Sequence, residues 1–326
     1  MSEDNSKWKD YLLKSSLPLE FEVKQKLKEL GFWTEYDFSY LRANENNIVT
    51  EFSYDIDATK EIGIHCFELM IECKFRDDST NWLFLPEQYN ESDRGIGMND
   101  FLNTNDFFYK HKYPDFFKTL NFKETARLCS KGIEIHSNGQ NPKTITQAVS
   151  QLSFALIEKV ITAFNKQIEQ KEEHEHFIYH HIPIIVTTAN LYRLRDDISI
   201  SDIRNATDLT QLADKEKMLL MEPPLSVCRQ DYAKKKLEEF EKNFSKEELN
   251  RMLNAQLKTN GRDYESNKNH LIKYPEGVLV IQHSSDHNSF RSLLDTLEQI
   301  NRPKNETIER LDKEFETKIP AFNSFR

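Results

Sequence analysis

Strict alternation of polar and apolar residues predicts a strand over residues 51–58. Its polar positions are Glu51, Ser53, Asp55 and Asp57, which are expected to share one face. Residues 32–41 are rich in aromatic side chains and also alternate, which predicts a strand just before this one. Residues 67–75 carry apolar side chains on both faces, which is typical of a central strand. Glu72 and Lys74 lie on one face at the end of that strand.

Helical spacing of apolar residues predicts helices on either side of the three strands. The first covers residues 17–30, with an apolar stripe at Leu19, Val23, Leu27 and Leu30 and a stop at Gly31. The clearest helix covers residues 144–164. Apolar runs at 183–194 and 277–282 predict buried strands, and residues 290–300 predict a last helix. Residues 76–142 are expected to be irregular with short helices.

The order of these elements predicts an α/β fold in which helices flank a central sheet. Residues 196–274 are highly charged and predict a mainly helical insertion. We therefore expect a core formed by residues 1–195 and completed by residues 275–326, with the insertion between them.

Composition excludes some classes of protein. With 326 residues, 38% hydrophobic residues and a mean hydropathy of -0.71, the chain is expected to fold around a substantial core. It shows neither an apolar run long enough for a membrane span nor a secretory signal, so we expect a cytoplasmic protein without membrane contact. The four cysteines are scattered and predict reduced thiols. The net charge of -10 disfavours nucleic-acid binding unless basic residues cluster or magnesium neutralises the site.

The charged residues of the two adjacent strands suggest a metal site. If the strands pair, Asp55 or Asp57 comes close to Glu72 at one end of the sheet. Carboxylate oxygens of this kind suit Mg²⁺, which binds one or two carboxylates together with water and substrate phosphates. Lys74, on the same face as Glu72, would lie beside the attacking water or the scissile phosphate.

The two segments Y-D-I-D-A (54–58) and I-E-C-K (71–74) resemble the motif of the PD-(D/E)xK nuclease superfamily. The resemblance implies a restriction-endonuclease-like fold, over about residues 16–194 and 277–300, and hydrolysis of phosphodiester bonds with Mg²⁺ or Mn²⁺. It implies Asp55 and Glu72 as metal ligands and Lys74 as the catalytic lysine. DNA is favoured over RNA as substrate because most members of the superfamily cut DNA.

Further residues follow from the same resemblance. Many members add an acidic residue on the first helix, and Glu20 matches it, because it lies about 20° from Leu27 on a helical wheel. Some members use a glutamine on the helix after the Glu-x-Lys strand; Gln147 and Gln151 are the candidates for contacting nucleic acid, although packing beside the apolar stripe is the favoured explanation for them. The usual proline before the first aspartate is absent here, and Asp57 remains an alternative ligand to Asp55.

Other segments have simpler interpretations. Lys110 and Lys112 lie among aromatic residues in the segment 105–118, which suggests nucleic-acid binding or, alternatively, a core or partner interface. Four histidines within 174–181 do not follow a structural zinc pattern and predict a solvated connection between a helix and a strand. Gly95 and Gly97 lack the remaining residues of a phosphate-binding loop.

The sequence thus predicts a metal-dependent nuclease, with restriction, repair and antiphage defence as possible settings. The alternative is a non-catalytic module of the same fold, whose acidic charge and insertion mediate assembly with a partner protein or a second copy. The simpler interpretation of Glu72 and Lys74 themselves is an ordinary exposed pair of opposite charges.

Overall fold

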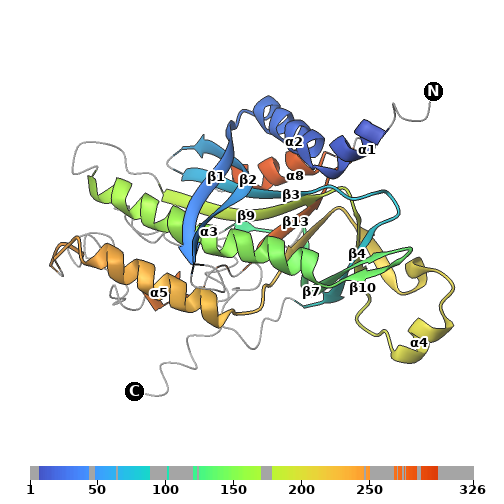
Figure 1. The fold of residues 1–326 in the computed structure, drawn as a ribbon. Coiled ribbons are helices and arrows are strands. Elements are labelled where there is room, and N and C mark those ends of the chain that lie inside the picture. Colours follow the sequence, from blue (N-terminus) through green and yellow to red (C-terminus); the bar gives the residue numbers. More distant parts are fainter. Residues whose placement is uncertain are drawn as a thin grey trace, which may run out of the picture.

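The computed structural model describes residues 7–43, 48–63, 65–88, 101–102, 120–122, 125–169 and 178–245, together with 247–249, 268–269, 271–273, 275, 277–284 and 288–299. Within these ranges the chain forms a mixed α/β structure, with one large sheet flanked by helices on both faces (Figure 1). The predicted α/β sheet with flanking helices is therefore confirmed. No helix in the described ranges has the length and apolar character needed to cross a membrane.

The first half of the sheet comes from strands close in sequence. Helices α1 (Lys7–Lys14) and α2 (Leu17–Glu29) precede three antiparallel strands. These strands are β1 (Trp33–Ala43), β2 (Val49–Ile62) and β3 (His65–Lys74). After β3 the order of strands no longer follows the chain, because β3 pairs in parallel with β9 (Ile178–Thr187). The helix α3 (Lys143–Glu169) lies between β3 and β9 in sequence, as predicted.

The remaining strands extend the sheet beyond β9. Their order is β9, β13, β12, β7, β4, β10 and β11, and β8 lies beside β7. Their bounds are β4 Asn81–Pro86, β7 Arg127–His136, β8 Gly139–Asn141, β10 Asn190–Leu194, β11 Ala213–Glu216, β12 Met218–Met221 and β13 Val278–Gln282. A separate pair of short strands is formed by β5 (Phe101–Leu102) and β6 (Leu120–Asn121).

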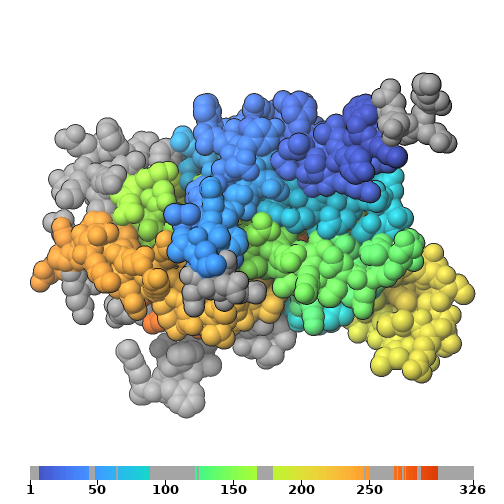
Figure 2. All heavy atoms as spheres, viewed as in Figure 1, coloured from blue at the N-terminus to red at the C-terminus, as the bar shows by residue number. Residues whose placement is uncertain are grey.

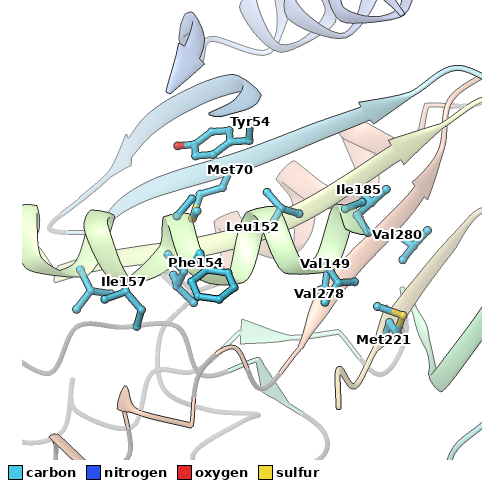
Figure 3. Close-up of a cluster of buried hydrophobic side chains, with 14 of the residues drawn as sticks. Tyr54, Met70, Val149, Leu152, Phe154, Ile157, Ile185, Met221, Val278 and Val280 are labelled. Atoms are coloured by element: carbon cyan, nitrogen blue, oxygen red, sulfur yellow. The ribbon is translucent and has the colours of Figure 1, made fainter. Parts of the chain in front are cut away.

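Two apolar clusters hold the helices to the sheet. On one face α3 and α5 (Val227–Glu241) pack over it, and Figure 3 shows Val149 and Leu152 of α3 beside Met70, Ile185 and Val280 of the strands. On the other face α2 and α8 (Ser289–Glu298) cover the same strands. Strands β3, β9 and β13 are thus buried on both faces, which explains why their sequences are apolar without a clear polar side.

The segment 76–142 is not irregular as predicted, because it supplies β4, β7 and β8. Trp82 and Phe84 alternate with less buried neighbours, so β4 does carry a strand pattern, but over six residues only. Its partners are β7 and β10, which are distant in the sequence. Pairing of this kind is set by tertiary packing and is weakly encoded in a short segment.

The charged segment 196–274 also differs from the prediction. Its described part includes α4 (Ile200–Asn205), the short 3-10 helix η2 (Leu209–Gln211) and α5, but also the strands β11 and β12. Because β12 lies between β13 and β7, part of this segment belongs to the central sheet, although most of its described regular structure is helical. All four residues of β12 are buried, and a run this short does not reveal its periodicity.

Candidate functional site

The alternation of β2 breaks at Asp55. Tyr54 packs in the cluster under α3, whereas Ile56, two residues later, packs in the cluster under α2. The pairing of β2 with β3 runs from Ile62 to Ile56 and stops before Asp55. Instead, the Asp55 carboxylate accepts a hydrogen bond from the backbone N–H of Cys73, at 2.6 Å. Where the backbone of β2 no longer pairs with β3, the Asp55 side chain therefore takes over and holds the end of β3 by this hydrogen bond.

Glu72 lies at this end of β3, with only 1% of its surface exposed. One carboxylate oxygen, Oε1, forms an ion pair with the ammonium group of Lys74. The other oxygen, Oε2, is buried and accepts no hydrogen bond from any described residue. Since a buried carboxylate oxygen without a partner costs free energy, this atom calls for a ligand that the described residues do not provide.

Glu20 of α2 belongs to the same cluster of charges. Burial and, to a smaller extent, the charges of Asp55 and Asp37 together raise its pKa to about 7, against the opposing charge of Lys74. The predicted inward position of Glu20 is consistent with its partial burial and with its interaction with these residues. The helix α2 thus brings one more carboxyl group to the end of β2 and β3.

The carboxyl groups of this cluster repel one another. Burial raises the pKa of Glu72 to about 7, Asp55 raises it as well, and Lys74 acts in the opposite direction. Burial also raises the pKa of Asp55, against the hydrogen bond from Cys73 and the charge of Lys74. We refer to Glu20, Asp55, Glu72 and Lys74 as the carboxylate cluster. Its negative charge exceeds what Lys74 neutralises, which favours binding of a cation.

Asp57 lies in a different environment, although the alternation predicted that it shares a face with Asp55. It accepts hydrogen bonds from the hydroxyl of Tyr54 at 2.8 Å and from the ammonium of Lys159 at 2.6 Å. Lys159, on α3, also lies 3.6 Å from Glu68. The structure thus separates the two aspartates because the irregularity at Asp55 reorients the strand between them. Asp57 serves an internal ion-pair network.

Glu68 extends this network to β9. Its Oε2 lies 3.0 Å from Nδ1 of His181. Burial raises the pKa of Glu68, but the hydrogen bond with His181 and the charges of His181 and Lys159 outweigh burial and lower it to about 2. The ionised form of Glu68 is therefore favoured in this network, in contrast to Glu72.

His180 and His181 do not lie in a solvated connection as predicted. His180 and His181 are buried residues of β9, and His180 lies 2.9 Å from His65 through their ring nitrogens. His174 and His176 lie outside the described residues. The sequence did not reveal this part of the strand, because His180 and His181 occupy buried positions that apolar residues usually fill.

The residues predicted to contact nucleic acid lie in different environments from one another. Gln151 of α3 donates a hydrogen bond from its side chain to the backbone oxygen of Ser53, at 3.2 Å, two residues before Asp55. Gln147 is exposed one turn earlier. Lys110 and Lys112 lie outside the described residues, as do Gly95 and Gly97. Gln151 therefore supports the strand that carries Asp55.

Asp37 was not identified from the sequence. It lies in β1 with a φ of 54°, which is uncommon for a residue other than glycine, and its charge raises the pKa of both Glu20 and Asp55. Strained backbone of this kind concentrates at functional sites. A backbone angle leaves no trace in the alternation, although aspartate is one of the residues that tolerate it.

Comparison with known proteins gave no match to a family model, to a curated protein or to a solved structure. Within the described ranges, no three His, Cys, Asp or Glu side chains are arranged to hold a metal ion by themselves. The carboxylate cluster instead offers Asp55 and Glu72, and the unpartnered Oε2 of Glu72 suits a hard cation such as Mg²⁺, which takes few protein ligands. The residues present therefore fit such an ion.

Proposed function

We propose that the protein is a metal-dependent nuclease of the PD-(D/E)xK type, which hydrolyses phosphodiester bonds, with DNA as the favoured substrate. The observation that carries this proposal is the buried Oε2 of Glu72, which has no described partner and lies in a cluster with Asp55 and Lys74. An ordinary exposed pair of Glu72 and Lys74 does not account for it, because the Glu72 side chain is only 2% exposed.

The roles of the residues follow from their positions. Asp55 and Glu72 would hold Mg²⁺ or Mn²⁺, and Glu20 adds negative charge from α2. When bound, such an ion lowers the pKa of water and neutralises phosphate charge. Lys74, held by Glu72, supplies a cation to stabilise the charge that develops on the scissile phosphate. The Cys73 amide fixes the Asp55 carboxylate in this arrangement.

The fold supports this proposal. The chain order of α2, β1, β2, β3, α3 and β9 agrees with the order of the restriction-endonuclease-like core, and the strands lie in the spatial order β1, β2, β3, β9. The strands β4 to β8 are additions between β3 and α3. The alternative, a module that only assembles with other proteins, does not require four interacting charged residues at the end of β3.

Digestion of DNA with Mg²⁺ or Mn²⁺ tests the proposal. Plasmid and single-stranded DNA are expected to be cut by the wild type and not by the Asp55→Asn variant. The Asp57→Asn variant is a matched control, two residues away in the same strand, because Asp57 contacts Tyr54 and Lys159 and not the cluster. Assayed below its unfolding temperature, it is expected to retain cleavage. Lack of cleavage by the wild type, or equal loss in both variants, would contradict the proposed site.

Magnesium is expected to raise the melting temperature more at pH 8 than at pH 5.5. Because the pKa of Glu72 rises from 4.5 in the unfolded chain to about 7 in the folded protein, the folded state binds a proton more tightly. The stability contributed by this proton is present below pH 4.5 and is lost as the pH rises through 7. At pH 8 the ionised carboxyl groups of the cluster repel one another and bind Mg²⁺. At pH 5.5 protons compete with Mg²⁺ for the same carboxyl groups.

This prediction is measured by thermal unfolding in MgCl₂ and in NaCl of equal ionic strength. The Asp55→Asn variant serves as the control and is expected to show a much smaller shift. An equal shift at both pH values, or an unchanged shift in the variant, would place the bound magnesium elsewhere.

A further inference from the structure

The N-terminal part of the chain forms an exposed aromatic surface. Helix α1 has no buried residue. Together with α2 and β1 it exposes large apolar side chains: Trp8, Tyr11, Leu17, Phe21 and Tyr36. Figure 2 shows these elements as a continuous blue region along one side of the molecule. We refer to the five side chains as the aromatic surface. Exposed apolar area of this kind marks a binding site more often than a free surface.

Lysine side chains lie among these aromatic residues. The ammonium of Lys24 lies 3.3 Å from the ring centre of Tyr36, and that of Lys9 lies 5.8 Å from the ring centre of Trp8. Residues 7–43 carry seven basic and six acidic side chains, and two of the acidic ones are Glu20 and Asp37. The whole chain, by contrast, has a net charge of -10. The aromatic surface is therefore one of the less acidic parts of the protein, which suits a negatively charged ligand.

The aromatic surface continues into the carboxylate cluster. Phe21 follows Glu20 on α2, and Tyr36 precedes Asp37 on β1. Burial raises the pKa of Tyr36, and the charge of Glu20 raises it as well, so the two side chains lie within electrostatic reach. A ligand bound along α2 and the start of β1 thus lies close to the proposed site.

A second copy of the chain is a weaker candidate for this surface. Strand β1 is the edge of the sheet and could in principle pair with another strand. At Asp37, however, the positive φ interrupts the strand, and its pairing with Asp55 is missing from the ladder. This irregularity in the middle of β1 hinders the addition of an eleven-residue partner strand.

We propose that the aromatic surface binds an unpaired strand of DNA and directs it to the carboxylate cluster. Bases stack on exposed aromatic rings regardless of sequence, and lysines between the rings attract the phosphates. The aromatic rings cannot reach the stacked bases of an intact duplex, so single strands, overhangs and flaps are the favoured substrates. This inference rests on the proposed nuclease function for the position of the cut.

Binding is tested without cleavage, using a fluorescent 20-nucleotide single strand and the matching duplex in EDTA. The wild type is expected to bind the single strand at least tenfold more tightly than the duplex. The double variant Trp8→Ala/Tyr11→Ala is expected to lose at least tenfold in affinity, because stacking contributes about 1–3 kcal/mol per base. It should fold normally, since α1 buries no side chain.

A control variant and a light-scattering measurement separate the possible outcomes. Ile200→Ala/Val227→Ala removes apolar side chains that are equally exposed, at 72% each, on α4 and α5, and is expected to bind like the wild type. Equal affinity of the wild type and the Trp8/Tyr11 variant, or preference for duplex, would overturn the inference. So would a wild-type dimer that the Trp8/Tyr11 variant converts to a monomer in light scattering. If single strands bind as expected but are never cut with metal, the nuclease proposal fails and the binding surface stands.

Discussion

Glu72→Gln is expected to abolish metal-dependent cleavage and, at pH 8, to make the protein more stable. The substitution preserves the size of the side chain but removes a metal ligand, so we expect a loss of activity of at least about 10³-fold. In the metal-free protein the ionised Glu72 is buried beside Asp55. The shift of its pKa from 4.5 to about 7 corresponds to a destabilisation of up to about 3 kcal/mol above pH 7. The neutral amide of glutamine removes this destabilisation.

The measurement combines cleavage assays with thermal unfolding in EDTA at pH 5 and pH 8. Because Glu72 is already largely protonated at pH 5, the variant is expected to match the wild type there and to exceed it at pH 8. A functional site that reduces stability is a common trade-off. If the variant is destabilised at pH 8, Glu72 serves the structure through its ion pair with Lys74, and the metal-site assignment is wrong.

Lys159→Met is expected to lower the free energy of unfolding by about 3–5 kcal/mol, because it leaves the buried Glu68 and the half-buried Asp57 without their shared cation. The Lys159 side chain is only 8% exposed and lies between Asp57 and Glu68. Methionine has a similar shape, so the effect reports the charge and not a cavity. Chemical denaturation at pH 7 measures it.

Lys236→Met provides the comparison for this prediction. Lys236 pairs with Glu158 at 2.8 Å, but its side chain is 27% exposed, so its loss is expected to cost at most about 1 kcal/mol. Adding Asp57→Asn and Glu68→Gln to Lys159→Met should recover much of the stability, since no buried charge then lacks a partner. A small effect of Lys159→Met alone would show that water reaches this network.

The sequence was sufficient for elements whose pattern is long and local. The stripe of α2, the length of α3 and the apolar runs of β3 and β13 each predict the observed element. Asp55 could be selected from the alternation of its strand, and Glu72, Lys74 and Glu20 because they lie near the ends of their elements. Their meeting at one end of the sheet follows from the pairing of adjacent strands.

The sequence was insufficient where the structure of a segment depends on strands distant in the chain or on a local distortion of the backbone. The short strands β4 and β12 become strands only through partners far away in the chain. The single strand predicted for residues 183–194 is in fact two, β9 and β10, which join different neighbours in the sheet. The irregularity at Asp55 separates this residue from Asp57, and the positive φ of Asp37 is equally invisible in a binary pattern.

Strand β3 lies between β2 and β9, and nine of its ten residues are buried. The aromatic surface, in contrast, lies on the outermost strand, on α2 and on α1, which contributes nothing to the core. If this surface binds nucleic acid as we propose, substitutions on α1 change the binding preference at little cost in stability, whereas β3 tolerates few. Such a division would let the binding preference of this protein diversify in evolution while its chemistry is retained.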